Sequence, residues 1–302
     1  MSNKVRSFFS SLIRKKDIEE IQAAARNSEL KRTLSRFDLI SLGVGCTIGT
    51  GIFVLTGFVA REYTGPSIAI SFVIAGIASS LTAFSYAELS SIIPTSGSAY
   101  TFATASMGEF FGWIVGMNLV LEYLVGASTI AVGWSEYLSS LVKVVFKKDM
   151  GTKFTASPIN YSAHTGFDAV ASASQEAKNP QKDLPIGIIV SLLFCTTLYI
   201  SVSIVMTGVS SYTKIMDGSI AQIFEKHPGA KWIEIVINIG AVAGLSSAIL
   251  VSLMAQPRMF MVMSEDGLLP SIFSRLHPRF KTPYWSTIIT GIICCTLSGF
   301  LP

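Results

Sequence analysis

Charged side chains are scarce in this sequence. Asp, Glu, Lys and Arg make up only 14% of its 302 residues, whereas 50% of the residues are hydrophobic. A soluble domain of this size could not keep so many apolar side chains off its surface. The shortage of charge therefore excludes an ordinary soluble fold, and it predicts that a lipid bilayer surrounds most of the chain.

Histidine and cysteine are also rare, with three and four residues respectively. All four cysteines lie in apolar segments without CxxC spacing or a neighbouring histidine, and the sequence has no HExxH or GxSxG motif. We therefore expect no disulfide framework, no metal site, no cofactor and no catalytic residue. The cysteines, which we interpret as packing residues, are Cys46, Cys195, Cys294 and Cys295.

Basic residues gather in positions 1–36, ahead of the first apolar segment. Such a cluster could bind nucleic acid, but it is also typical of a cytoplasmic tail that precedes a membrane span. The apolar segment that follows favours the tail, and no signal peptide is evident, because a long polar stretch comes first. We expect a cytoplasmic amino terminus and no nucleic-acid partner. The cluster consists of Lys4, Arg6, Arg14, Lys15, Lys16, Arg26, Lys31, Arg32 and Arg36.

Several apolar segments approach or exceed the length of about 20 residues that a bilayer-spanning helix needs. They predict an all-α, polytopic membrane protein whose transmembrane domain occupies residues 37–302. The segment 99–146 could hold two spans, but no charged or proline-rich loop divides it, so we predict one long helix. The expected spans are 37–60, 67–93, 99–146, 184–209, 232–255 and 287–301.

The charges of the loops agree with this topology except in one region. Short cytoplasmic loops are usually basic, and the loop 256–285, which lies inside if the amino terminus does, carries four basic residues. Lys178 and Lys182 also lie inside if residues 150–177 cross the membrane. The basic residues of 147–153 then lie outside, against the rule, which marks this part of the sequence as irregular.

The first apolar segment is rich in glycine, with Gly43, Gly45, Gly49 and Gly51 inside nine residues. Each glycine costs about 1 kcal/mol inside a helix, so the segment can unwind. Unwound backbone in a membrane must line a cavity or be buried in protein, where its amides and carbonyls suit the two charges of an amino acid. Close helix packing through small residues explains the glycines equally well.

Short motifs follow one another along almost the whole chain. They are Arg36-Phe37-Asp38 with the run from Gly43 to Phe53, Tyr86-Ala87-Glu88-Leu89, the run from Pro94 to Thr101, Leu121-Glu122-Tyr123, Gly166-Phe167-Asp168-Ala169-Val170, the run from Glu176 to Gly187, and Asp266-Gly267-Leu268-Leu269-Pro270 with His277-Pro278-Arg279-Phe280. In this order they resemble the cationic amino acid transporter family, within the amino acid, polyamine and organocation superfamily.

The resemblance implies a partial inverted-repeat (LeuT-like) transporter fold with broken helices 1 and 6 around an amino-acid site. In such proteins the break of helix 1 binds the substrate carboxylate, and a nearby carbonyl together with the break of helix 6 binds the amine. The corresponding carboxylate site here is Gly49, Thr50 and Gly51. The residues that correspond to the amine site are Ile48, Ala163, Thr165 and Gly166.

Two further sets of residues follow from the same resemblance and from their positions in apolar segments. A coupling proton or sodium ion is expected near Gly45, Ser246 and Ser247. Glu122 is an acid within an apolar run, which marks a functional residue by default, although a salt bridge or a cap on a neighbouring helix would also explain it. Tyr123 beside it either lines the pocket or packs in the core.

The chain departs from the family pattern between residues 158 and 166. It carries counterparts of helices 1–3, a remnant of helix 6 and helices 7–9, whereas helices 4–5 and those after 9 have no counterpart. We expect an amino-acid transporter working by alternating access, for arginine, lysine or a neutral amino acid, in the plasma membrane or an endomembrane. The alternative is a non-transporting truncated isoform or gene-model fragment of such a permease.

Overall fold

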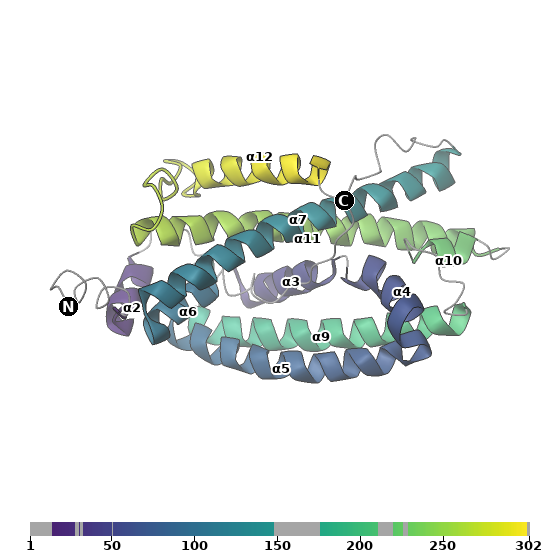
Figure 1. The fold of residues 1–302 in the computed structure, drawn as a ribbon, viewed down its shortest axis with the longest axis horizontal. Coiled ribbons are helices and arrows are strands. Elements are labelled where there is room, and N and C mark those ends of the chain that lie inside the picture. The colour runs from purple at the N-terminus through teal and green to yellow at the C-terminus, as the bar shows by residue number, and fades with distance from the viewer. Residues whose placement is uncertain are drawn as a thin grey trace, which may run out of the picture.

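The structure is a computed structural model, and it describes residues 14–27, 30, 33–49, 51–147, 176–210, 220–225 and 229–300. Every named element among these residues is helical (Figure 1). The elements are α2 (Ile18–Arg26), α3 (Arg36–Thr47), η1 (Gly51–Leu55), α4 (Thr56–Val59), η2 (Ala60–Thr64), η3 (Gly65–Ser67), α5 (Ile68–Ile92), α6 (Ser98–Met107), α7 (Glu109–Phe146), α9 (Pro180–Val209), α10 (Gln222–Glu225), α11 (Lys231–Glu265) and α12 (Tyr284–Phe300).

Four helical stretches are long and apolar enough to cross a membrane: Thr56–Ile92, Glu109–Phe146, Pro180–Val209 and Lys231–Glu265. The helix Tyr284–Phe300 is apolar but shorter. Many large apolar side chains on the outer faces of α5, α7, α9 and α11 are exposed, as expected where lipid replaces water. The all-helical membrane fold predicted from the composition is therefore confirmed at this coarse level.

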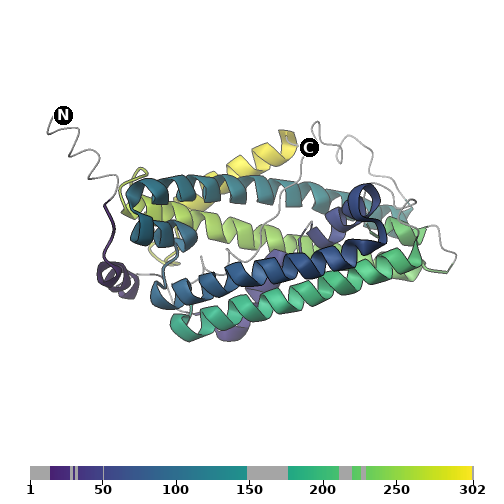
Figure 2. The same ribbon diagram turned by 60° about the horizontal axis from the view of Figure 1, so that its bottom comes forward.

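The long helices form two packed pairs with α3 between them. Helix α5 lies along α9, as Figures 1 and 2 both show, and α7 packs against α11, which it crosses obliquely in Figure 1. Helix α3 contacts both α9 and α11, and α12 packs on α7 and α11. The first helix is thereby enclosed by protein on two sides, which is where interrupted backbone is tolerated in a membrane.

The prediction of one helix over 99–146 is wrong. Gly108 separates α6 from α7 with φ of 104°, a conformation that favours glycine. A Cβ added at Gly112 would lie 2.0 Å from Thr104 Oγ1, and one at Gly116 would lie 2.9 Å from a ring carbon of Tyr100. These contacts show that α6 folds back antiparallel on α7. A single glycine makes this reversal, so the absence of a charged or proline-rich loop was the wrong criterion.

The prediction of a loop from residue 256 is also wrong, because α11 continues to Glu265 through Pro257. Arg258 therefore lies inside the helix, and its side chain is only 7% exposed. Its Nε and Nη2 both donate to Oε1 of Glu176, at 2.8 and 2.7 Å. The buried guanidinium is accommodated because a carboxylate from a distant part of the chain neutralises it.

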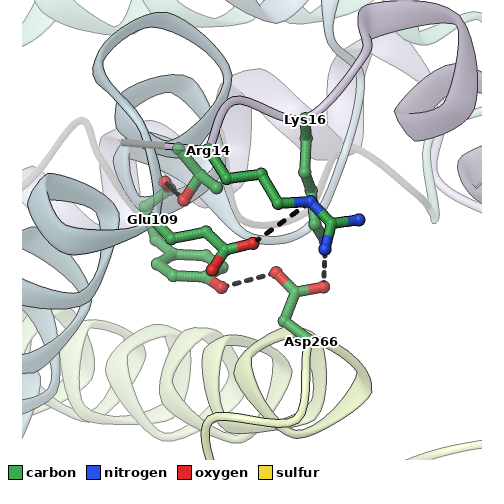
Figure 3. Close-up of polar contacts among 6 residues, drawn as sticks. Arg14, Lys16, Glu109 and Asp266 are labelled. Atoms are coloured by element: carbon green, nitrogen blue, oxygen red, sulfur yellow. Dashed lines mark hydrogen bonds and ion pairs between the residues drawn. The ribbon is translucent and has the colours of Figure 1, made fainter. Parts of the chain in front are cut away.

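The segment before α2 forms ion pairs with the start of α7 and with the residue that follows α11 (Figure 3). Arg14 forms an ion pair with Glu109 at the start of α7, and Lys16 forms one with Asp266 just after α11. The buried Tyr100 of α6 donates its hydroxyl proton to the same Asp266. Burial and this carboxylate raise the pKa of Tyr100, so the phenol keeps its proton and remains a donor.

Replacing Asp266 by alanine is expected to lower the free energy of unfolding by about 1–3 kcal/mol, because the buried Tyr100 hydroxyl loses its acceptor. Asp266→Asn is the matched control, since it removes the charge but retains an acceptor oxygen. Thermal unfolding of the purified chain in detergent measures both. Equal losses for the two variants would show that the ion pair with Lys16, and not the Tyr100 hydrogen bond, accounts for the effect.

Candidate functional site

The first helix is interrupted at its glycine-rich segment. Helix α3 begins with a capping box between Ser35 and Asp38 and ends at Thr47. Ile48 has φ of −77° and ψ of 72°, and the Gly49 N–H bonds to the Thr47 carbonyl at 2.9 Å, which is the geometry of an inverse γ-turn. A π-helical turn, η1, then begins at Gly51. The unwinding that the glycines predict is therefore present in the structure.

The same glycines also permit close helix packing. A Cβ added at Gly45 would lie 2.3 Å from Ser247 Oγ, and one at Gly51 would lie 2.4 Å from the hydroxyl oxygen of Tyr199. From the facing helix, a Cβ at Gly244 would approach the Ile48 carbonyl to 3.5 Å. The segment therefore contains both an interruption of the helix and close helix packing, at neighbouring positions.

Two tyrosines from other helices hold the main chain around the interruption. Tyr199 of α9 donates to the Thr47 carbonyl at 3.0 Å. Tyr137 of α7 donates to the Phe53 carbonyl at 2.6 Å and accepts a hydrogen bond from the Ile220 N–H at 2.9 Å. The sequence analysis did not identify these residues. Their one available signal was a hydroxyl within an apolar helix, which needs a partner there.

The residues predicted for a coupling ion are only partly brought together. Gly45 and Ser247 are in contact across the interface between α3 and α11. The Ser246 hydroxyl instead accepts a hydrogen bond from Trp134 Nε1 at 2.8 Å and donates to the Val242 carbonyl at 2.7 Å. Ser246 therefore links α11 to α7, while Ser247 is the serine that faces α3.

The predicted residues of α7 are Glu122 and Tyr123. Tyr123 is buried in an apolar cluster that also contains Cys46 and Val251. Gly49 instead faces Ile130 and Ala248, which belong to another cluster. Tyr123 and Ile130 are seven residues apart, which corresponds to about 10 Å along α7, so Tyr123 belongs to a different cluster of the interior from the residues that face Gly49. Glu122 is half-buried beside it.

Four of the predicted site residues have no place in the description of the site. Thr50, Ala163, Thr165 and Gly166 lie outside the described residues, and their assignment stays a prediction. Of the predicted carboxylate site, the structure describes Gly49 and Gly51, and of the predicted amine site it describes Ile48.

Comparison with known proteins defines the class. The amino acid permease family matches residues 34–160 and 150–302. The chain is 38% identical to the methylthioribose transporter of Bacillus subtilis (strain 168) over 368 positions, covering 97% of this chain and 80% of that protein. It is 36% identical to the branched-chain amino acid permease BcaP of the same organism, again with 97% and 80% coverage. These proteins are membrane transporters and not enzymes.

The chain belongs to the amino acid permease family. It is also 35% identical to the vacuolar cationic amino acid transporter 2 of Arabidopsis thaliana, over 97% of this chain but only 59% of that protein's length. The alignment with the Bacillus methylthioribose transporter, at 368 positions, is longer than the 302 residues of the chain. That relative therefore contains residues without a counterpart here, and the family match divides at 150–160.

Proposed function

We propose that this chain is a secondary transporter that carries an amino acid across a membrane by alternating access around the interrupted first helix. The observation that carries the proposal is the inverse γ-turn at Ile48 between α3 and η1, inside a bundle of the amino acid permease family. The amino terminus is proposed to be cytoplasmic, in the plasma membrane or an endomembrane. The fold is proposed to be a partial inverted repeat.

The interruption presents opposite partial charges to one small molecule. The end of α3 carries the negative end of its helix dipole and suits an ammonium group, with the Ile48 carbonyl as the proposed acceptor. The backbone amides that begin the next helical segment, at Gly51, suit a carboxylate. We propose arginine or lysine as substrate, and a neutral amino acid as the second choice, because relatives include a branched-chain permease and cationic transporters. Gly45 and Ser247 are the proposed region of a coupling proton or sodium ion.

A second candidate is a form that does not transport. The relatives contain residues that this chain lacks, and two spans are proposed to be missing between α7 and α9. A bundle without these two spans would retain the contacts of the described helices, but part of the proposed amino-acid site would not be enclosed by protein. Such a form could bind an amino acid, or associate with longer relatives, without moving the substrate.

Uptake by the purified full chain in proteoliposomes tests the proposal. Radiolabelled arginine, leucine and methylthioribose are offered separately, with an inward proton or sodium gradient. Saturable arginine uptake above that of empty vesicles is the expected result, and leucine uptake would favour the neutral substrate. A folded, monodisperse protein that takes up none of the three above empty vesicles would contradict transport and support the second candidate.

A further inference from the structure

One face of α9 follows α3 up to the interruption. Ile188 packs with Leu39 near the start of α3, and the Cys195 thiol lies 4.0 Å from the Val44 carbonyl. Residues seven and four positions apart share a face of a helix. The next position on this face is Tyr199. The register of α9 against α3 therefore places the Tyr199 hydroxyl at the end of α3.

Tyr199 contacts the chain on both sides of the interruption. Its hydroxyl donates to the Thr47 carbonyl at 3.0 Å, at the end of α3. The same oxygen would lie 2.4 Å from a Cβ at Gly51, the first residue of η1. Phe72 of α5 supports the ring edge-to-face, with centroids 5.0 Å apart. Tyr137, by comparison, donates to the Phe53 carbonyl on the η1 side and accepts from the Ile220 N–H.

We propose that Tyr199 is a positioning residue that sets the spacing between the two half-helices. The hydroxyl donates to the carbonyl that ends α3 and lies against Gly51, the first residue of η1, so one neutral side chain fixes the distance between the two segments. Tyr199 occupies the Thr47 carbonyl, which is next to the Ile48 carbonyl proposed above as the acceptor of a substrate amine. This inference rests on the proposed transport function for its consequence, but its geometry can be tested without transport.

The geometric test is a double-mutant cycle on thermal unfolding of the purified full chain in nanodiscs. Gly51→Ala is expected to lower the unfolding temperature by several degrees, because its Cβ meets the Tyr199 hydroxyl. In a Tyr199→Phe background the hydroxyl is gone, and the same substitution should cost much less. Tyr137→Phe is the matched control: it also removes a hydroxyl bonded to a backbone carbonyl, and the Gly51→Ala penalty should be unchanged in that background.

The outcomes of this cycle decide the geometry. A Gly51→Ala penalty that is equal with and without the Tyr199 hydroxyl would overturn the proposal. If Gly51→Ala yields no folded protein, recovery of folded protein in the Gly51→Ala, Tyr199→Phe double variant supports the proposal, and failure to recover it counts against it.

A functional readout separates positioning from packing. In proteoliposomes Tyr199→Phe is expected to raise KM for arginine about three- to tenfold, with a smaller change in maximal rate. The reason is that the variant loses one hydrogen bond that orders the site before the substrate binds. An unchanged KM in a variant that transports would overturn the positioning role. Absence of uptake by the unaltered chain would instead contradict the proposed function, while the unfolding cycle would still decide whether Tyr199 bridges the interruption.

Discussion

Replacing Arg258 by alanine is expected to lower the free energy of unfolding by about 3–5 kcal/mol. The Arg258 side chain is 7% exposed and its partner Glu176 is 16% exposed, so removing the guanidinium leaves a buried carboxylate without its counter-charge. The pair joins α11 to the segment that leads into α9, where Leu34 and Ala177 also form a backbone bridge. Thermal or chemical unfolding in nanodiscs measures the loss.

Two further variants make this measurement specific. Arg275→Ala removes an arginine from the exposed surface beyond α11 and should change stability little, as expected for a solvated charge. A double replacement, Arg258→Met with Glu176→Gln, removes both charges and should recover much of the lost stability. An equal loss for Arg258→Ala and Arg275→Ala would show that the ion pair is not buried as the structure has it.

Replacing Gly45 by leucine is expected to separate α3 from α11 and to abolish arginine uptake. Even a Cβ at this position would lie 2.3 Å from Ser247 Oγ and 3.4 Å from Ser247 Cβ, so a leucine cannot be accommodated without moving one helix. Overpacking of this kind costs about 1–3 kcal/mol of stability, and more where neighbours cannot yield. Unfolding temperature and uptake are measured on the same preparation.

The matched control for Gly45 lies on the facing helix. Gly240 of α11 has no atoms within 4 Å of an added Cβ, so Gly240→Leu adds the same side chain where it meets open space. It should preserve both stability and uptake. If Gly45→Leu behaves like Gly240→Leu, the close approach of α3 to α11, and with it the proposed ion region at Gly45 and Ser247, would have to be abandoned.

The glycines of the first segment illustrate how far sequence reasoning reaches. Their density is consistent with either an interruption or close helix packing, the family resemblance places the break at Gly49–Gly51, and the structure ends α3 at Thr47. The glycine pattern could not predict which side chain holds the interrupted backbone, because Tyr199 is 152 residues away from Thr47 along the chain. Which side chain reaches a carbonyl depends on the register between α9 and α3, and register is a property of packed helices.

The errors of the sequence analysis have the same origin. Gly108 and Pro257 are both residues that break helices, yet the chain reverses at the first and continues as a helix through the second. At Gly108 the reversal lets α6 pack on α7, with Thr104 against Gly112. At Pro257 the helix continues, and the Arg258 charge is neutralised by Glu176 from a distant segment. Local propensity leaves both outcomes open, and tertiary contacts choose between them.

Hydrophobic length and charge scarcity were enough to indicate lipid as the solvent and helices as the elements, because both act locally along the chain, and the glycines marked the segment in which the first helix is interrupted. The packed structure was needed to show which helices pair, where α6 turns back, which serine faces α3 and which tyrosine contacts both sides of the interruption. Those features depend on distances of a few ångströms between segments far apart in the chain. Such distances are set by close packing of whole helices, which no local pattern of residues encodes.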